Sequence, residues 1–149
     1  MIKTFTLNNI SFKADPVKTK KLYAKQVPNI STANGDDVTI YLLAKKHMVI
    51  KSFFEKLGVN IDCPFNYGNH LYFPVVGEII SYGKDGYEEV DVYAEQFYKK
   101  LDLEQDNLNL AKVKIDFGKN NFYCSLHLIK DTPYTRHNNK MFYIAIEEN

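Results

Sequence analysis

The sequence predicts one α+β domain over residues 1–149, in which an antiparallel sheet of about five to six strands packs against one long helix and is preceded by a short helix. Three observations support this fold class. Apolar residues between positions 37 and 57 recur at helical spacing, whereas those in the second half of the chain alternate with polar residues, as in strands. With 45% hydrophobic residues, the 149-residue chain can bury its own core without disulfides.

The N-terminal region is expected to form a strand pair over residues 2–13, with an Asn-Asn turn, followed by a short helix. Asp15 and Pro16 start this helix, because an Asp side chain accepts from free N–H groups and proline loses no hydrogen bond at the first helical position. The helix should end near Gln26. Val17, Tyr23 and Ala24 should share one side of it, and Lys18, Lys21 and Lys25 another.

The clearest predicted element is one helix over residues 37–57. Acidic residues at its start suit the helix dipole, and Gly58 is the expected C-terminal stop. Apolar residues three and four positions apart give it one continuous inner face. That face consists of Val38, Leu42, Leu43, Val49, Ile50, Phe53, Phe54 and Leu57.

Beyond this helix the hydrophobic pattern has the period of two that indicates strands. A strand over residues 71–82 contains Pro74 and Gly77, so we expect it at the edge of the sheet or interrupted by a bulge. A second strand is expected over 87–93. Residues 94–101 could continue that strand or form a helical turn.

A hairpin and a final strand complete the predicted sheet. Residues 113–117 and 122–128 alternate on either side of a Gly-Lys-Asn-Asn turn, and the last strand covers residues 141–146. The returning hairpin strand should place Phe122, Cys124, Leu126 and Leu128 on its apolar face, and Tyr123, Ser125 and His127 on the other.

The net charge of +1 conceals an uneven distribution. Residues 1–56 contain ten lysines and four acidic residues, whereas residues 57–110 contain three lysines and ten acidic residues. Within the second region, the segment 85–98 combines five carboxylates and four aromatic residues with no Lys or Arg. It is either a docking surface for a basic partner or a solvated edge strand whose charges prevent pairing. The candidate partner-binding residues are Tyr87, Glu88, Glu89, Asp91, Tyr93 and Glu95.

The lysines of residues 13–25 also have two interpretations. They could form a patch that follows a phosphate backbone, or they could be the solvated face of a short helix. The chain contains no sequence signature of a common nucleic-acid-binding fold, so nucleic acid is not the partner that the sequence favours.

Candidate catalytic residues do not assemble into a known pattern. His70 and His127 each lie in or beside a strand, as in two-histidine phosphoesterases, which need a hydroxyl two positions after each histidine. Tyr72 supplies a phenol at the first position, but Ile129 supplies no hydroxyl at the second. His127 is therefore expected to be an ordinary sheet residue beside Tyr123.

The sequence also favours neither a metal site nor a reactive thiol, and no cofactor is expected. Cys63, His70, Cys124, His127 and His137 lack the spacing of known zinc ligands. Cys124 falls on an apolar strand face, and Cys63 is expected in a more exposed loop before Pro64. His47 lies at the boundary of the long helix's inner face.

The segments Asp15–Val17, Lys21–Tyr23, Pro28–Ser31 and Ser52–Val59 resemble a loose family of small bacterial proteins, some of which accompany contact-dependent toxins as immunity proteins. The likeness covers residues 13–65. Members of that family have clustered cysteines where this chain has residues 31–37. The resemblance implies inhibition of a toxin and supplies no catalytic residues.

Taken together, these features predict a non-enzymatic immunity or inhibitor protein that neutralises one cognate, basic protein partner through its acidic, Tyr-rich segment. Two alternatives stay open. One is a single-stranded nucleic-acid-binding protein that stacks bases on sheet aromatics. The other is a small-molecule-binding protein or enzyme whose pocket, between helix and sheet, gathers His70, His127 or Cys63.

Location follows from what the chain lacks. No apolar run approaches the ~20 residues that a membrane span needs. The first residues alternate in polarity instead of forming the apolar centre of a signal peptide. Two cysteines without an export signal indicate reduced thiols, so we expect a cytoplasmic protein without membrane contact.

Overall fold

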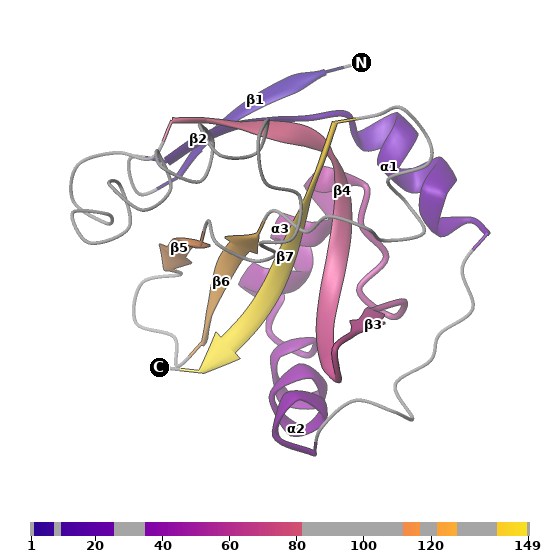
Figure 1. Ribbon diagram of the computed structural model, residues 1–149, viewed down its shortest axis with the longest axis vertical. Coiled ribbons are helices and arrows are strands. Elements are labelled where there is room, and N and C mark those ends of the chain that lie inside the picture. Colours follow the sequence, from indigo (N-terminus) through magenta and orange to yellow (C-terminus); the bar gives the residue numbers. More distant parts are fainter. Residues whose placement is uncertain are drawn as a thin grey trace.

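An antiparallel sheet forms the centre of the computed structural model (Figure 1), which describes residues 2–7, 10–25, 35–81, 112–116, 122–127 and 140–148. Six strands follow the order β1-β2-β4-β7-β6-β5, and β3 pairs with β4 beside this path. The strands are β1 (Lys3–Leu7), β2 (Ile10–Ala14), β3 (Phe65–Tyr67), β4 (His70–Ser81), β5 (Lys112–Asp116), β6 (Phe122–His127) and β7 (Met141–Glu148). The predicted α+β class is confirmed.

The N-terminal strand pair and the helix after it form where the sequence predicts them. β1 and β2 pair in antiparallel fashion, and the Asp15 carboxylate accepts a hydrogen bond from the Lys18 backbone N–H at 3.0 Å to start α1 (Pro16–Tyr23). The helix ends before Gln26. Its buried residues are Thr19 and Tyr23, which face β4. Of the three residues expected to share a side, only Tyr23 is buried, whereas Val17 and Ala24 are exposed.

The single helix expected over residues 37–57 is two helices, α2 (Gly35–Ala44) and α3 (Met48–Leu57). The chain breaks at His47, whose backbone is extended with φ −78° and ψ 122°. Between Ala44 and Met48 the sequence contains only Lys, Lys and His, so this turn has no apolar side chain to bury. After the break each helix packs in its own direction. Leu42, Leu43 and Val49, expected on the inner face, are exposed.

Pro74 and Gly77 predicted that β4 lies at the edge of the sheet or is interrupted by a bulge. It lies inside the sheet, and its pairing with β2 contains a register shift, from Ser11–Ser81 to Phe12–Ile79. β7 pairs along one side of it, while β3 and β2 share the other side and leave a gap around Pro74. Helix α1 fills this gap. The Tyr23 hydroxyl donates to the Pro74 carbonyl at 2.8 Å, and the Val76 N–H donates to the Thr19 hydroxyl at 3.0 Å. Because Pro74 meets side chains of α1 here, and not another strand, its missing N–H costs no ladder hydrogen bond.

One face of the sheet is covered by α2 and α3, and α1 lies beside β4 (Figure 1). Gly58 ends α3 in the left-handed conformation, with φ 79°, as predicted. The core between the helices and the sheet contains Phe12, Tyr41, Ile50, Phe53, Phe54, Leu57, Phe73, Val75, Cys124, Leu126, Phe142 and Ile144. The predicted apolar face of β6 is therefore confirmed for Cys124 and Leu126.

The opposite face of the sheet has a different composition. It carries a second buried cluster around Tyr72 of β4 and Tyr143 of β7, together with Ser125 and His127 of β6. The strand expected over 87–93 and the undecided segment 94–101 lie outside the described residues. Among the described helices, none is long and apolar enough to cross a membrane.

Candidate functional site

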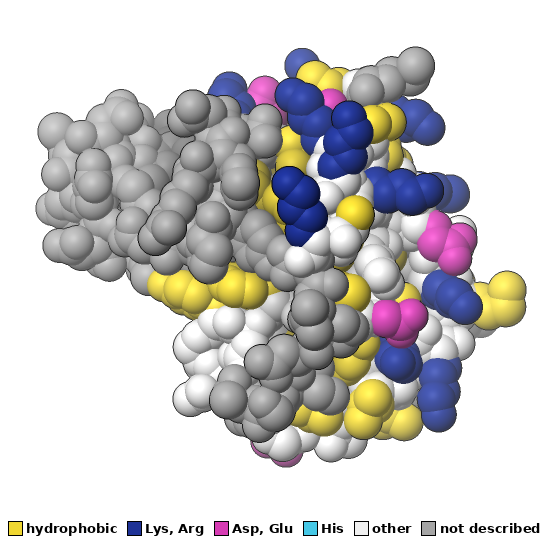
Figure 2. Space-filling view, turned by 90° about the vertical axis from the view of Figure 1, so that its right-hand side faces the viewer, with side chains coloured by type: hydrophobic (Ala, Val, Ile, Leu, Met, Phe, Trp, Pro, Cys, Tyr) yellow, Lys and Arg dark blue, Asp and Glu magenta, His cyan; other side chains and the backbone are white. Residues whose placement is uncertain are grey.

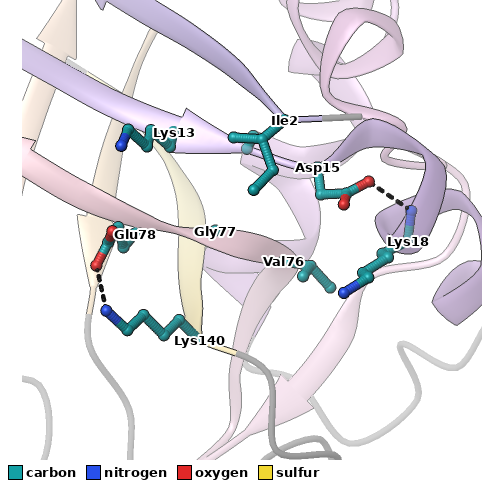
Figure 3. Close-up of a pocket in the computed structure, with 9 residues that line it drawn as sticks. Ile2, Lys13, Asp15, Lys18, Val76, Gly77, Glu78 and Lys140 are labelled. Carbon is teal, nitrogen blue, oxygen red and sulfur yellow. Dashed lines mark hydrogen bonds and ion pairs between the residues drawn. The ribbon is translucent and has the colours of Figure 1, made fainter.

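A pocket of about 190 Å³ opens where β2, α1, β4 and the start of β7 meet (Figure 3). Three lysines surround it: Lys13 and Lys18 from the consecutive elements β2 and α1, and Lys140 from the residue before β7. Two carboxylates and a set of small or aliphatic residues complete the walls. The lining consists of Ile2, Lys13, Ala14, Asp15, Lys18, Val76, Gly77, Glu78 and Lys140.

Each lysine reaches the pocket for a local reason. Lys13 lies between buried Phe12 and Ala14 on β2, so strand alternation turns it outward. Lys18 is in the first turn of α1, next to buried Thr19. Lys140 immediately precedes β7, and its carbonyl accepts a hydrogen bond from the Gly77 N–H at 2.8 Å.

Gly77 is required by the close approach of β2 at this point. A Cβ atom at position 77 would lie 2.0 Å from the Lys13 carbonyl oxygen, a distance that real Cβ atoms do not show. The absence of a side chain lets β2 pair with β4 beside the pocket, where Lys13 is the register partner of Glu78.

The two carboxylates of the pocket already have partners. Glu78 Oε2 lies 2.9 Å from Lys140 Nζ. Asp15 accepts the Lys18 backbone N–H, and this hydrogen bond lowers the pKa of the Asp15 carboxyl below its ordinary value. Within the described residues, no carboxylate lies within ion-pair distance of the ammonium groups of Lys13 and Lys18.

The pocket belongs to a larger basic surface, which we call the lysine face. Figure 2 shows Lys side chains gathered over the side of the molecule that carries α1. All members are exposed. The lysine face consists of Lys13, Lys18, Lys20, Lys21, Lys25 and Lys140. The sequence identified the members between 13 and 25, but not Lys140, because only the pairing of β4 with β7 brings it to α1.

His127 is a buried sheet residue on the second face. Its Nε2 lies 2.7 Å from the Ser125 hydroxyl, and its ring meets the Tyr72 ring edge-on at 5.3 Å. Ala145 of β7, the register partner of Ser125, leaves room for this contact. A serine beside a histidine is the arrangement of a nucleophile and its base, but Ser125 is 0% and His127 3% exposed, so neither meets a substrate.

His70 is separate from His127 and has its own partner. Its Nδ1 lies 3.0 Å from Asp37 Oδ2, and the same oxygen accepts the Leu71 N–H at 3.2 Å. Asp37 thus ties the start of α2 to the start of β4. His70, His127 and Cys63 line neither the pocket beside Lys13 and Lys18 nor a wider hollow of about 470 Å³ between α1 and α3.

Both cysteines are buried and unpaired with each other. The expectation that Cys63 is more exposed is wrong, since its loop packs into the core, and burial raises the pKa of its thiol. Burial also raises the pKa of Cys124. Over the described ranges, no cluster of three or more His, Cys, Asp or Glu side chains could hold a metal ion.

The predicted partner-binding residues Tyr87, Glu88, Glu89, Asp91, Tyr93 and Glu95 lie outside the described residues, as do His137 and Ile129. No protein-family model matches the chain, and comparisons with curated proteins and with solved structures find no match.

Proposed function

We propose that the protein is a non-enzymatic binding protein whose lysine face holds the phosphate backbone of a single-stranded nucleic acid. The observation that supports this proposal is that Lys140, from the start of β7, lies with Lys13 of β2 and Lys18 of α1 around one pocket. Lys20 and Lys21 of α1 and Lys25 after it continue the same surface. Ammonium groups in this arrangement can replace the counterions of successive phosphates.

The lysine face offers its ligand point charges. All six of its basic residues are lysines. Lysine binds phosphate as a point charge and lacks the planar group with which arginine takes phosphate or carboxylate in two parallel hydrogen bonds. Tyr72 and Tyr143 are buried, so these sheet aromatics do not stack bases, and the contact we propose is with the backbone alone.

Salt dependence tests this proposal directly. Binding of a fluorescein-labelled 15-nucleotide oligo-dT can be measured by fluorescence anisotropy at salt concentrations from ~25 to ~300 mM, a range over which the screening of exposed charges increases strongly. If all six lysines contact phosphates, the logarithm of the binding constant should fall with log salt at a slope of about −4.

Two matched triple variants separate the position of the charge from its amount. The first variant replaces three exposed lysines of α1, Lys18, Lys20 and Lys21, by Gln. The second replaces three exposed lysines in and just before α3, Lys46, Lys51 and Lys56, by Gln. The first variant should lower the magnitude of the slope by about 2, and the second should leave it nearly unchanged.

Three results would contradict the proposal: no oligonucleotide binding at low salt, an equal loss in both triple variants, or equally tight binding of polyglutamate of the same length. The last result would assign the lysine face to an acidic protein.

A second candidate function rests on the acidic, Tyr-rich segment 85–98. Its five carboxylates without a basic residue support an immunity or inhibitor protein, of bacterial toxin–antitoxin type, that occludes a basic protein partner. The candidate contacts are Tyr87, Glu88, Glu89, Asp91, Tyr93 and Glu95. A cytoplasmic location is part of both proposals and is supported by two cysteines that form no disulfide.

Charge reversal tests the second candidate. The protein and its Glu88, Glu89 and Asp91→Lys variant are used side by side to capture proteins from the native host lysate. We expect one stoichiometric basic protein to bind the first and not the second. Recovery of the same proteins by both would remove this segment from the interface.

A further inference from the structure

We infer that the wider hollow between α1 and α3 is a binding site for a free amino acid with an aliphatic side chain. Its volume of about 470 Å³ lies in the range of about 300–1,000 Å³ that is typical of small-ligand sites. The pocket beside Lys13 and Lys18 is smaller, at about 190 Å³. This inference goes beyond the proposed function and does not depend on it, because the site needs no nucleic acid.

Two opposite charges lie on the two sides of the hollow. Helix α1 contributes Lys20, and helix α3 contributes Glu55. Both residues are exposed, and neither side chain forms an ion pair within the described parts of the chain. A ligand that carries both an ammonium and a carboxylate group can therefore bind the two charges without displacing an internal partner.

The end of α3 determines which charge of the ligand lies where. Gly58, the C-terminal cap of α3, lines the hollow, and Glu55 lies in the last turn of the same helix. A helix carries a partial negative charge at this end, so a carboxylate there is unfavourable by itself and a bound ammonium group relieves the repulsion. The ammonium group of the ligand is therefore expected beside Glu55, and its carboxylate beside Lys20.

The surface between these two charges is apolar. Tyr23 and Val59 line the hollow, and both are buried. The Tyr23 hydroxyl donates to the Pro74 carbonyl at 2.8 Å, so this polar atom is directed to β4 and the ring lines the hollow. An aliphatic side chain gains free energy by covering such a surface, whereas a further charged group would lose hydration there. The site therefore favours an aliphatic amino acid.

The two sides of the hollow are held together by the fold. The backbone at Gly58 lies so close to α1 that a Cβ atom there would be 2.2 Å from the Pro16 carbonyl oxygen. This contact determines the separation of the backbones that carry Lys20 and Glu55. Because the walls are formed before the ligand arrives, binding requires little ordering of the chain.

The test compares leucine with two analogues that keep its side chain. Isocaproate lacks the ammonium group, and isoamylamine lacks the carboxylate. Each is titrated into the isotope-labelled full chain, and NMR follows the backbone amide resonances of Gly58, Val59 and Asn60, which line the hollow. We expect leucine to shift them in a saturable way and to bind at least about tenfold more tightly than either analogue, as a hydrogen bond between charged groups provides.

Three variants assign the two charges. In Glu55→Gln, the preference for leucine over isocaproate should disappear, and the preference over isoamylamine should remain. Lys20→Gln should have the opposite effect. Lys56→Gln is the control, because Lys56 is exposed beside Glu55 but does not line the hollow, so both preferences should remain.

Several outcomes would overturn the inference. They are the absence of saturable shifts with leucine, equal affinity for leucine and either analogue, and an equal loss of preference in the control variant. The comparison of the three ligands uses the unchanged chain, so it decides the matter even if a variant does not fold. No oligonucleotide is present, and the proposed function therefore stands or fails separately, by its own salt dependence.

Discussion

The two faces of the sheet are stabilised in different ways. On the face covered by α2 and α3, aromatic rings such as Phe54 and Phe73 meet at 4.8 Å between centroids, and contact and volume determine the fit. On the other face, Ser125 and His127 are buried beside Tyr143, and a 2.7 Å hydrogen bond joins the first two. The first face depends on filling space, and the second depends on satisfying polar atoms.

Removing volume from the helix-covered face should have the largest effect. Phe54 is 0% exposed, so Phe54→Ala leaves a cavity and should lower the free energy of unfolding by about 3–5 kcal/mol. Met48 lies in the same helix but is 80% exposed, so Met48→Ala should change stability by less than about 0.5 kcal/mol. Chemical denaturation measures both, and similar losses would show that position 54 does not belong to the core.

The edge of β4 that α1 covers should show the next largest effect. Thr19→Val keeps the shape of the side chain and removes the acceptor of the buried Val76 N–H, which should cost about 1–3 kcal/mol. Thr39→Val is the control, because its hydroxyl donates to a carbonyl at an exposed site. Equal thermal stability of the two variants would mean that α1 does not satisfy the gap beside Pro74.

The polar face should respond to the loss of a hydrogen bond. Ser125→Ala removes the partner at the buried His127 Nε2 and should lower the free energy of unfolding by about 1–3 kcal/mol. Adding His127→Phe should recover part of this loss, because replacing both partners by apolar groups avoids an unmatched polar atom. A double variant with the summed loss of the two single variants would show that the residues act independently.

The smallest effect concerns the start of α1 and depends on pH. The folded-state pKa of Asp15 is below its ordinary value of 3.8, so its contribution is complete above that value and is lost as the pH falls through the folded-state pKa. Asp15→Asn keeps a capping side chain and should cost only about 0.3 kcal/mol at pH 7. Between about pH 5 and pH 2, the range over which a carboxyl titrates, the stability of the variant should decrease less than that of the unchanged chain. Parallel plots of stability against pH for the two proteins would contradict this.

Elements that depend on neighbouring residues could be predicted from the sequence. Asp15 and Pro16 start α1, Gly58 ends α3, and the alternation of β6 assigns its two faces correctly. Each of these signals lies within a few residues of the feature that it determines.

The features that sequence reasoning missed depend on residues far apart in the chain. Pro74 and Gly77 predicted an edge strand or a bulged one, and the contacts of the Tyr23 and Thr19 hydroxyls explain how Pro74 lies inside the sheet. The apolar spacing over 37–57 predicted one helix, although it is interrupted at Lys45, Lys46 and His47, where the chain breaks into α2 and α3. Lys140 joins the candidate site through strand pairing, which no local pattern reveals.

The position of β7 between β4 and β6 also determines when the sheet can assemble. Phe73 pairs with Ile144 and Leu126 pairs with the same residue from the other side, so β7 joins two groups of strands that, among the described strands, do not pair directly. It is synthesised after every other described strand. During translation, β4 and β6 therefore leave the ribosome before β7 can pair with their backbone N–H and C=O groups. The loop between β4 and β7 is long, and closing it costs entropy. Slow folding and exposure to chaperones therefore follow from the topology.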